Sequence, residues 1–370
     1  MYDFSFQSPV KSMAGRGKFR SIGEFTGSKK ILLISDKIIS SMAFYGEIKE
    51  LLKGRIAGEF AGVMPNPECE MVDEAVTLCK SCGADCVIGI GGGSVLDTAK
   101  AVAVLSCEEG KTADYMAGKA LGRHRQELIL VPTTAGTGSE VTNVSVLTDP
   151  KINKKLSLVD PILYGDIAII DPCLTETMPK RVAAASGFDA LCHAIEAYWN
   201  IRTSPLCEAL SMEAVDKIVK NIYPACNGDG DAQEEMVIAS YIAGISFNQT
   251  RTTVCHAISY KLTSDYGIDH GLACAFTLIP FLRYESEDPA VKAALDRMGR
   301  YCGFSGSEAL IDEIDRLYDA VGLPRHLSDR GVKPEDVDAI VDAGMAVPIT
   351  KLCKREVTRE AMHRIITDLL

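Results

Sequence analysis

Short apolar runs alternate with amphipathic stretches through the first half of the chain. The run 29–36 (KKILLISD) precedes a helical pattern that ends at Gly54. Strand–helix alternation of this kind predicts a mostly parallel sheet covered by helices on both faces. Further strands are predicted at 56–63, 84–93, 127–134 and 166–172, helices at 68–83 and 94–106, and a hairpin at 141–149 and 154–161.

The pattern changes after about residue 178, where strand signals nearly vanish. Apolar residues then recur at helical spacing, as in RVAAASGFDALCHAIEAYW. We therefore predict an α/β domain over 1–178 followed by an all-helical domain over 179–370. No low-complexity linker separates them, so we expect close packing around a cleft. The helical segments are predicted at 181–199, 204–222, 231–249 and 308–322.

Charge and composition restrict the classes of molecule that the protein is expected to bind. The formal net charge of −11 gives no general attraction to nucleic acid or to an anionic membrane. No apolar run approaches the roughly 20 residues that span a bilayer, and the N-terminus lacks the apolar stretch of a signal peptide. These features predict a cytosolic protein. The thirteen cysteines are scattered along the chain, and an odd number cannot all pair, so reduced thiols are favoured over a disulfide framework. Cys79, Cys82 and Cys86 lie close together in the sequence and are predicted to be structural thiols rather than a metal cluster.

A glycine-rich turn follows the predicted strand 84–93. Gly92, Gly93 and Ser94 open the next helix, where backbone N–H groups and the helix dipole suit a pyrophosphate. Alone, GGGS is also compatible with a tight strand–helix turn. Asp97 lies in the first helical turn, which suits the dipole, and it is a candidate to face the cleft. Asp36, after the first clear strand, is either a ribose ligand that disfavours NADP or a helix N-cap.

A second small-residue loop, PTTAGTGSEVT (132–142), follows the strand 127–134. Its hydroxyls could donate hydrogen bonds to a cofactor, although a plain Gly/Thr loop has the same composition. The candidates are Thr133, Thr134, Thr137 and Ser139.

A carboxylate and three imidazoles form the candidate metal site. Asp189 and His193 are spaced i, i+4, which places both on one helix face. His256 lies on another helical segment, and His270 follows fourteen residues later. One carboxylate and three imidazoles suit Fe²⁺ or Zn²⁺. Two alternatives stay open: Asp189 and His193 could be a capping or surface hydrogen-bonded pair, and the histidines could be core residues with satisfied hydrogen bonds.

These motifs resemble the iron-containing (group III) alcohol dehydrogenase family, within the dehydroquinate-synthase-like fold. The resemblance runs in order through ISDK, MPNPE, GGGSVLDTAKA, PTTAGTGSEVT, IIDP, GFDALCHAIEAYW and HAISYKLTSDYGIDHG. It implies that 1–178 binds the dinucleotide and that 179–370 binds the metal and the substrate. Asp36 favours NAD(H) as the cofactor, with NADP(H) as the alternative. Many members are dimers. The implied metal ligands are Asp189, His193, His256 and His270. The implied cofactor residues are Asp36, Gly92, Gly93, Ser94, Thr133, Thr134 and Lys155. Asn66, Asp97, Thr137 and Ser139, which lie in the matched motifs, are further cofactor candidates.

One position departs from the family pattern. The family often has a histidine four residues after the third ligand, as a proton relay, where this chain has Tyr260. A tyrosine can transfer a proton, but its reference pKa is about 10. We predict Tyr260 and His270 as the catalytic residues. Arg251, Lys154 and Lys261 are candidate cations for a phosphonate, because the last motif is also similar to the branch that reduces phosphonoacetaldehyde; solvated surface charges are the alternative.

The sequence therefore predicts a metal-dependent oxidoreductase that transfers hydride between NAD(P)H and a small aldehyde. A homodimer is expected, with no nucleic-acid or membrane partner. Two alternatives stay open. One is a dehydroquinate-synthase-like cyclase, a lyase that uses NAD transiently, and the other is a non-catalytic metal- or nucleotide-binding relative.

Overall fold

The computed structural model describes residues 3–370, which form two compact units. The α/β unit comprises Ser8–Thr134 and Gly138–Thr177. The helical unit comprises Ala135–Thr137 and Met178–Leu370, together with the N-terminal segment that ends at Gln7. No helix within residues 3–370 is long and apolar enough to cross a membrane.

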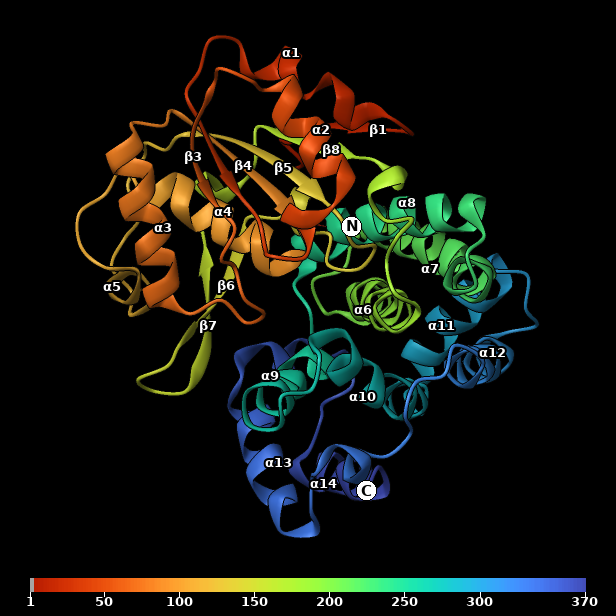
Figure 1. Ribbon diagram of the computed structural model, residues 1–370. Coiled ribbons are helices and arrows are strands. Elements are labelled where there is room, and N and C mark those ends of the chain that lie inside the picture. The colour runs from red at the N-terminus through yellow and green to blue at the C-terminus, as the bar shows by residue number, and fades with distance from the viewer. Residues whose placement is uncertain (1–2) are drawn as a thin grey trace. The chain divides into compact units, whose positions relative to one another are not determined.

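Six parallel strands make the sheet of the α/β unit, in the order β1-β8-β5-β4-β2-β3 (Figure 1). The predicted α/β fold class is confirmed. The edge strand β1 (Lys11–Ala14) was missed by the sequence analysis because KSMA carries no apolar alternation. The other strands are β2 (Ile31–Ile34), β3 (Ile56–Phe60), β4 (Cys86–Gly91), β5 (Glu127–Pro132) and β8 (Ile167–Ile170).

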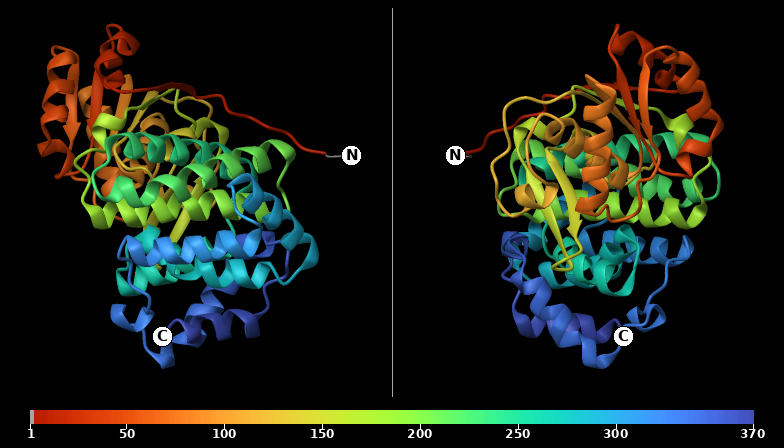
Figure 2. Two further views of the ribbon diagram at one scale, coloured as in Figure 1. Left: turned by 90° about the vertical axis from the view of Figure 1, so that its right-hand side faces the viewer. Right: turned by 60° about the vertical axis from the view of Figure 1, so that its left-hand side comes forward.

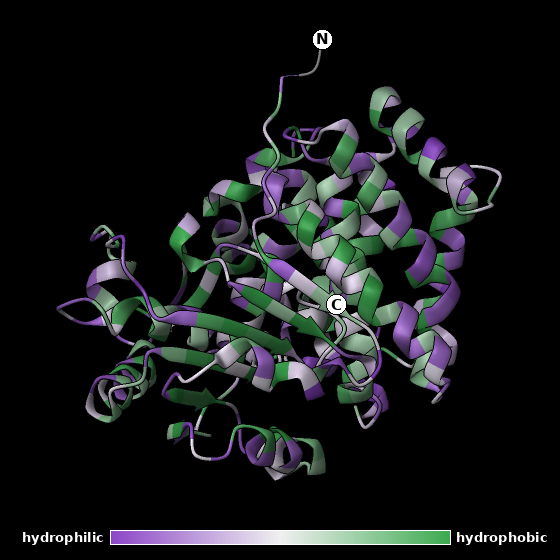
Figure 3. Cartoon of the chain, turned by 90° about the horizontal axis from the view of Figure 1, so that it is seen from above, coloured by the Kyte–Doolittle hydropathy of each residue, from purple (hydrophilic) through white to green (hydrophobic). Residues whose placement is uncertain are grey.

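Helices cover both faces of this sheet, which is why its central strands are apolar along their whole length. Alternate residues face opposite sides: Leu32 and Ile34 join one buried cluster, and Ile31 and Leu33 join the other. The first cluster includes α3 (Cys69–Cys82) and α4 (Gly93–Leu105), and the second includes α1 (Ile22–Thr26) and α2 (Ala43–Leu51). The hydropathy colouring shows the resulting apolar strands (Figure 3).

The strand order reverses between β2 and β4. From β2 the chain crosses to β3 on one side, whereas β4, β5 and β8 follow on the other. A ligand in an open parallel sheet typically binds at this switch point, beyond the carboxyl ends of the strands. Asp36 follows β2, and the turn Gly92–Gly93 follows β4. The topology therefore brings the carboxyl ends of these two strands to one edge of the sheet. The predicted hairpin is also present, as β6 (Val144–Asp149) and β7 (Lys154–Val159).

Long helices make up the helical unit, as the sequence predicted (Figure 2). The helices α6 (Lys180–Trp199), α7 (Pro205–Cys226) and α8 (Gly230–Thr250) pack against one another, and α10 (His270–Glu285) packs on both α6 and α9 (Val254–Tyr266). The remaining helices are α11 (Pro289–Tyr301), α12 (Ser307–Ala320), α13 (Val337–Ala346) and α14 (Arg359–Asp368).

A buried lysine ties α4 to the loop that follows β5. The Lys100 ammonium is fully buried and donates to Ser139 Oγ (2.7 Å), Thr142 Oγ1 (2.9 Å) and the Val144 carbonyl (2.8 Å). All three of its donors are thus used. Burial lowers the pKa of Lys100 to about 8 and raises the pKa of the neighbouring Glu140 to about 7. Folding therefore keeps two ionisable groups in an apolar interior.

We expect Glu140 to make stability depend on pH. Because its folded pKa is about 7 and its ordinary value is 4.5, the folded protein keeps a proton that the unfolded chain releases. This stabilisation is present below the unfolded pKa and is lost as the pH rises through the folded pKa. Between about pH 5.5 and about pH 8, the wild type should lose about 2 kcal/mol relative to Glu140→Gln. Guanidinium unfolding of both proteins measures this change. If the free energies of unfolding of the wild type and of Glu140→Gln differed by the same amount at both pH values, the prediction would be wrong.

Candidate metal centre

One face of α6 carries three buried polar side chains. Asp189, His193 and Glu196 are spaced i, i+4 and i+7, so they lie on the same side of the helix. All three are at most 5% exposed. The rest of the helix is largely alanine and other apolar residues, because α7, α8 and α10 surround it. The helix therefore presents its polar groups to the interior of the unit.

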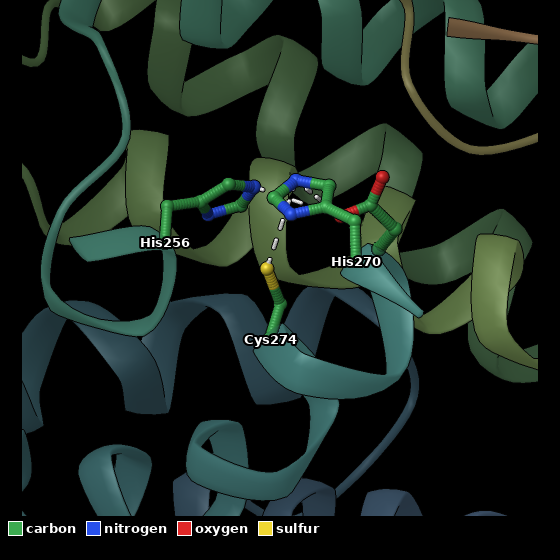
Figure 4. Close-up of side chains that lie close together, drawn as sticks. His256, His270 and Cys274 are labelled. Atoms are coloured by element: carbon green, nitrogen blue, oxygen red, sulfur yellow. Dashed lines mark hydrogen bonds and ion pairs between the residues drawn. The ribbon is translucent and has the colours of Figure 1, made fainter. Parts of the chain in front are cut away.

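Two further helices bring their side chains to this face. The helix α9 carries His256, and His270 and Cys274 lie one turn apart at the start of α10. Figure 4 shows His256, His270 and Cys274 pointing toward one another. A glycine allows this approach, because a Cβ built on Gly271 would lie 2.3 Å from the Ala185 carbonyl oxygen. No larger residue fits here without displacing α10 from α6.

The donor atoms of this cluster are separated by distances that suit ligands of one ion. Asp189 Oδ1 lies 3.6 Å from His256 Nε2 and 3.8 Å from His270 Nε2, and Cys274 Sγ lies 3.9 Å from His270 Nε2. One ligand atom from each of the four residues lies within 4.8 Å of the others. Donors about 2.1–2.3 Å from a shared tetrahedral ion would be about 3.4–3.8 Å apart.

Two of these atoms have no hydrogen-bond partner although they are buried. They are Asp189 Oδ1 and His256 Nε2. An unpaired buried polar atom costs about 1–3 kcal/mol, so native structures rarely leave one without a ligand, water or ion. A carboxylate oxygen and imidazole nitrogens are donors that Fe²⁺ and Zn²⁺ accept. The residues present therefore fit a divalent metal ion.

The three histidine rings are oriented by acceptors on their Nδ1 atoms. His256 Nδ1 contacts the Glu196 carboxylate, and His193 Nδ1 lies 3.2 Å from the Gly136 carbonyl oxygen. His270 Nδ1 lies 3.4 Å from Ser259 Oγ, whose own proton goes to the His256 carbonyl. Because each contact needs Nδ1 to donate, we assign the Nδ1–H tautomer, which leaves a lone pair on every Nε2.

Glu196 is the main support of His256. It is fully buried and also accepts from Thr253 Oγ1 and from the Cys255 backbone N–H, both at 2.7 Å. Burial alone would raise its pKa, but His256 and these donors lower it. Burial would likewise lower the pKa of His256, yet Cys274, Glu196 and Asp189 raise it well above its usual value. The groups around His256 thus favour a positive charge on its Nε2 side, carried by a proton or by a bound cation.

His193 lies beside the donor cluster rather than within it. Its ring stacks on Phe247 (centroids 4.1 Å apart) and on His256 (4.5 Å). Burial lowers the pKa of His193 to about 4, so its imidazole is neutral near pH 7. The group that converges contains the other three predicted ligands and Cys274. Metal binding by His193 stays a prediction.

The candidate pyrophosphate turn lies at the start of α4. Gly92 is the N-cap, and no side chain caps the helix there. A Cβ on Gly91 would lie 2.5 Å from Val95, and one on Gly92 would lie 3.4 Å from Thr134. Thr133 Oγ1, at the end of β5, is buried without a hydrogen-bond partner. These features leave backbone N–H groups and a hydroxyl for a ligand at this edge.

Several other predicted cofactor residues have structural partners. Asp36 Oδ1 accepts from the backbone N–H groups of Ile38 and Ile39, so it caps the turn after β2. Asp97 accepts from Ser139 Oγ (2.6 Å) and the Val146 backbone N–H (2.9 Å), within the Lys100 network. Their cofactor roles stay predictions. Asn66 has a left-handed backbone (φ 56°), Lys155 lies half-buried in β7, and Thr137 belongs to the helical unit.

Two residues of the cluster were missed by the sequence analysis. Glu196 lies three residues after His193 and could have been found from the same helix-face spacing. Cys274 lies four residues after His270, which is the same signal on another helix. With thirteen cysteines scattered along the chain, spacing alone did not distinguish this one. The cysteines are free thiols in the structure.

Comparison with known proteins identifies relatives over the whole chain. The family models for iron-containing alcohol dehydrogenase and for its C-terminal part match residues 9–172 and 183–370. The chain is 31% identical to alcohol dehydrogenase 4 of Schizosaccharomyces pombe, covering 92% of this chain and 83% of that protein. It is 34% identical to sulfoacetaldehyde reductase of Bilophila wadsworthia, covering 86% and 85%. The crystal structure of sulfoacetaldehyde reductase from Bifidobacterium kashiwanohense in complex with NAD+ matches with a TM-score of 0.95 and 30% identity, covering 100% and 99%.

The chain belongs to the iron-containing alcohol dehydrogenase family. It is an oxidoreductase of the alcohol dehydrogenase and aldehyde reductase class, acting on aldehydes or alcohols. The predicted family, fold class and enzyme class are confirmed. The phosphonoacetaldehyde branch, the roles given to 1–178 and 179–370, the homodimer and the cytosolic location stay predictions.

We expect Gly271→Ala to lower the free energy of unfolding by about 1–3 kcal/mol, because the added methyl group would overlap the Ala185 carbonyl. Gly46→Ala is the control. Gly46 lies inside α2 with no atom within 4 Å of an added Cβ, so this change should be neutral or stabilise by up to about 1 kcal/mol. Chemical denaturation measures both. Equal effects of the two substitutions would show that α10 does not need the close approach.

Proposed function

We propose that this protein is a divalent-metal-dependent oxidoreductase that uses NAD(H) to interconvert a small aldehyde and its primary alcohol. The observation that carries the proposal is the convergence of Asp189 Oδ1, His256 Nε2 and His270 Nε2, two of them buried without a hydrogen-bond partner. Such a set leaves a coordination site for a substrate oxygen, because the His270 side chain is 33% exposed.

In this proposal Asp189, His193, His256 and His270 hold Fe²⁺ or Zn²⁺. When bound, the ion polarises the substrate carbonyl as a Lewis acid, and the nicotinamide supplies the hydride. The Glu196 carboxylate holds the His256 ring in the tautomer that offers Nε2. The Gly136 carbonyl does the same for His193.

The dinucleotide binds at the switch point of the sheet. Gly92, Gly93 and Ser94 provide uncapped N–H groups for the pyrophosphate, and Thr133 and Thr134 lie at the adjacent strand end. Asp36 accepts hydrogen bonds from the ribose and disfavours the extra phosphate of NADP. The similar enzyme solved with NAD+ supports this choice. Asn66, Asp97, Thr137, Ser139 and Lys155 complete the proposed cofactor site.

Tyr260 is the proposed proton donor. It is half-buried on α9, one turn beyond His256 and therefore on the same helix face. With a reference pKa of about 10, a phenol keeps its proton near neutral pH and can pass it to a stronger base such as an alkoxide. The reverse reaction returns the proton to the phenolate.

The substrate that we propose carries an anionic group, as in the reduction of phosphonoacetaldehyde to 2-hydroxyethylphosphonate. The two similar sulfoacetaldehyde reductases support this class, because a sulfonate and a phosphonate are both tetrahedral anions. Among the candidate cations, Lys261 is paired with Asp265, and Lys154 is exposed on the β6–β7 hairpin. Arg251 is half-buried between α8 and α9 and is the preferred anion ligand.

The backbone at Arg251 supports that choice. Its φ of 73° is unfavourable for a residue with a side chain, and such strain often marks a functional position. Asn200 Nδ2 and Thr250 Oγ1 both donate to the Arg251 carbonyl, at 3.0 and 2.9 Å, and hold this conformation. Thr253, two residues further on, binds Glu196.

The metal role is tested by His270→Ala, with His363→Ala as a control at a half-exposed histidine of α14. We expect His270→Ala to lower kcat for aldehyde reduction by at least about 100-fold, while NADH binding changes little. Chelation of the wild type should abolish turnover, and added Fe²⁺ or Zn²⁺ should restore it. The measurements are NADH oxidation, NADH fluorescence and metal analysis of the same samples.

The same assay separates the alternatives. Net NADH consumption with an aldehyde excludes a cyclase that returns its NAD unchanged. A protein that binds metal and NADH but turns over no aldehyde of a broad panel is a non-catalytic relative. Full activity after chelation, with no metal in the protein, would overturn the proposal.

The substrate class is tested by Arg251→Gln. We expect KM for phosphonoacetaldehyde to rise by about 10- to 100-fold, because a charge-assisted hydrogen bond is worth about 1.5–3 kcal/mol. KM for propionaldehyde, which has no anionic group, should stay unchanged. In Lys154→Gln, the control, KM should stay unchanged for both aldehydes. Comparison with sulfoacetaldehyde shows which anion is preferred. An equal rise of KM for the charged and uncharged aldehydes would contradict the role of Arg251.

A further inference from the structure

Cys274 belongs to the converging donor group although none of the reactions described above uses it. It lies one helical turn after His270 on α10 and is completely buried. Its Sγ is 3.9 Å from His270 Nε2, and its ligand atom lies within 4.8 Å of those of Asp189 and His256. In Figure 4 the thiol points toward the two imidazoles. Its place is therefore on the same centre as the proposed metal ligands.

A second observation points to a ligand among these atoms. Asp189 Oδ1 and His256 Nε2 are buried, unpartnered and directed into the group that contains the Cys274 thiol. A thiol is a weak hydrogen-bond donor and cannot satisfy both atoms. An ion among the four donors would satisfy them together. The thiol is the one soft donor in a set that otherwise consists of a carboxylate and imidazoles.

We propose that Cys274 binds the catalytic metal through its thiolate, and that this ligand makes the centre select Zn²⁺ over Fe²⁺. The inference rests on the proposed metal site. On binding, the Sγ–H bond breaks, the proton passes to solvent and a sulfur–metal bond forms, with no change in oxidation state. The Asp189 carboxylate and the thiolate together balance the two positive charges of the ion.

The selectivity follows from the chemistry of the donors. Carboxylate and imidazole ligands bind Fe²⁺ and Zn²⁺ alike, with Zn²⁺ the stronger of the two in the general order of affinities. A thiolate widens this difference because Zn²⁺ commonly takes sulfur ligands at about 2.3 Å. The structure therefore predicts a site whose preferred metal differs from the one in the name of its family.

The test uses Co²⁺ as a spectroscopic probe in full-length protein freed of metal by chelation. A thiolate ligand gives a cobalt–sulfur charge-transfer band in the near ultraviolet, whereas oxygen and nitrogen ligands give only the visible d–d bands. We expect both sets of bands in the wild type. Cys274→Ala and Cys274→Ser should lose the charge-transfer band and keep the d–d bands. Cys192→Ser, at a buried thiol next to His193, should keep both.

Each result decides something different. Visible d–d bands without a charge-transfer band in the wild type, or a charge-transfer band that survives in both Cys274 variants, would overturn the role of Cys274 and leave the metal site intact. No Co²⁺ bands at all, with no bound metal on analysis, would overturn the metal site itself. Circular dichroism checks that the variants fold, and serine provides a second variant of nearly native volume.

Metal competition tests the selectivity without any activity assay. Chelated wild type, exposed to equal Fe²⁺ and Zn²⁺ under anaerobic conditions, should bind Zn²⁺ in preference. In Cys274→Ala the ratio of bound Zn²⁺ to Fe²⁺ should fall by at least about tenfold, the equivalent of 1.4 kcal/mol. A ratio that is the same in both proteins would show that the thiol does not choose the metal.

Discussion

The helical unit depends on two carboxylates, Asp189 and Glu196, that are buried on one face of α6. Taking such charges out of water costs several kcal/mol each unless a positive charge or enough hydrogen bonds compensate. Glu196 is compensated within the protein by Thr253, the Cys255 backbone and the His256 ring. Asp189 Oδ1 has no hydrogen-bond partner; burial would raise the pKa of this carboxyl, but the neighbouring His193, His270 and His256 rings lower it. The site therefore favours a positive charge beside Asp189, which a proton on a neighbouring histidine or a bound cation supplies.

Close packing of helices keeps the Asp189 carboxylate buried. Gly271 brings α10 against the backbone of α6, and Gly136 brings a short loop segment against Ser186, where a Cβ would lie 2.7 Å away. These contacts belong to a packing that leaves Asp189 only 2% exposed to solvent. They also set the acceptors that orient His193 and His270. Gly271, next to His270, and Gly136, whose carbonyl contacts His193 Nδ1, thus contribute to the approach of the donors and to the orientation of His193.

Periodicity predicted most of the fold, because strands buried on both faces and amphipathic helices leave strong patterns. The i, i+4 spacing also predicted that Asp189 and His193 share a face. What spacing could not predict is which of several chemically suitable side chains reaches the centre. Cys274 lies in the donor group because the crossing of α10 over α6 decides the distances, whereas His193 stacks on Phe247 and its metal binding stays a prediction. Asp97 accepts a hydrogen bond from Ser139 and lies 3.6 Å from Lys100 Nζ, contacts that spacing did not predict, and its cofactor role stays a prediction.

The α/β unit follows the same principle as the helical unit, with a different ligand. Its sheet edge keeps Thr133 Oγ1 buried without a partner and leaves the start of α4 without a side-chain cap. Both features are costly in the free protein, and an anion that accepted hydrogen bonds there would remove both costs. The Lys100 network fixes α4 against the loop after β5, so the binding groups stay in place when no ligand is bound. Each unit therefore contains buried polar atoms without partners, and in the proposed function the metal ion and the dinucleotide provide those partners.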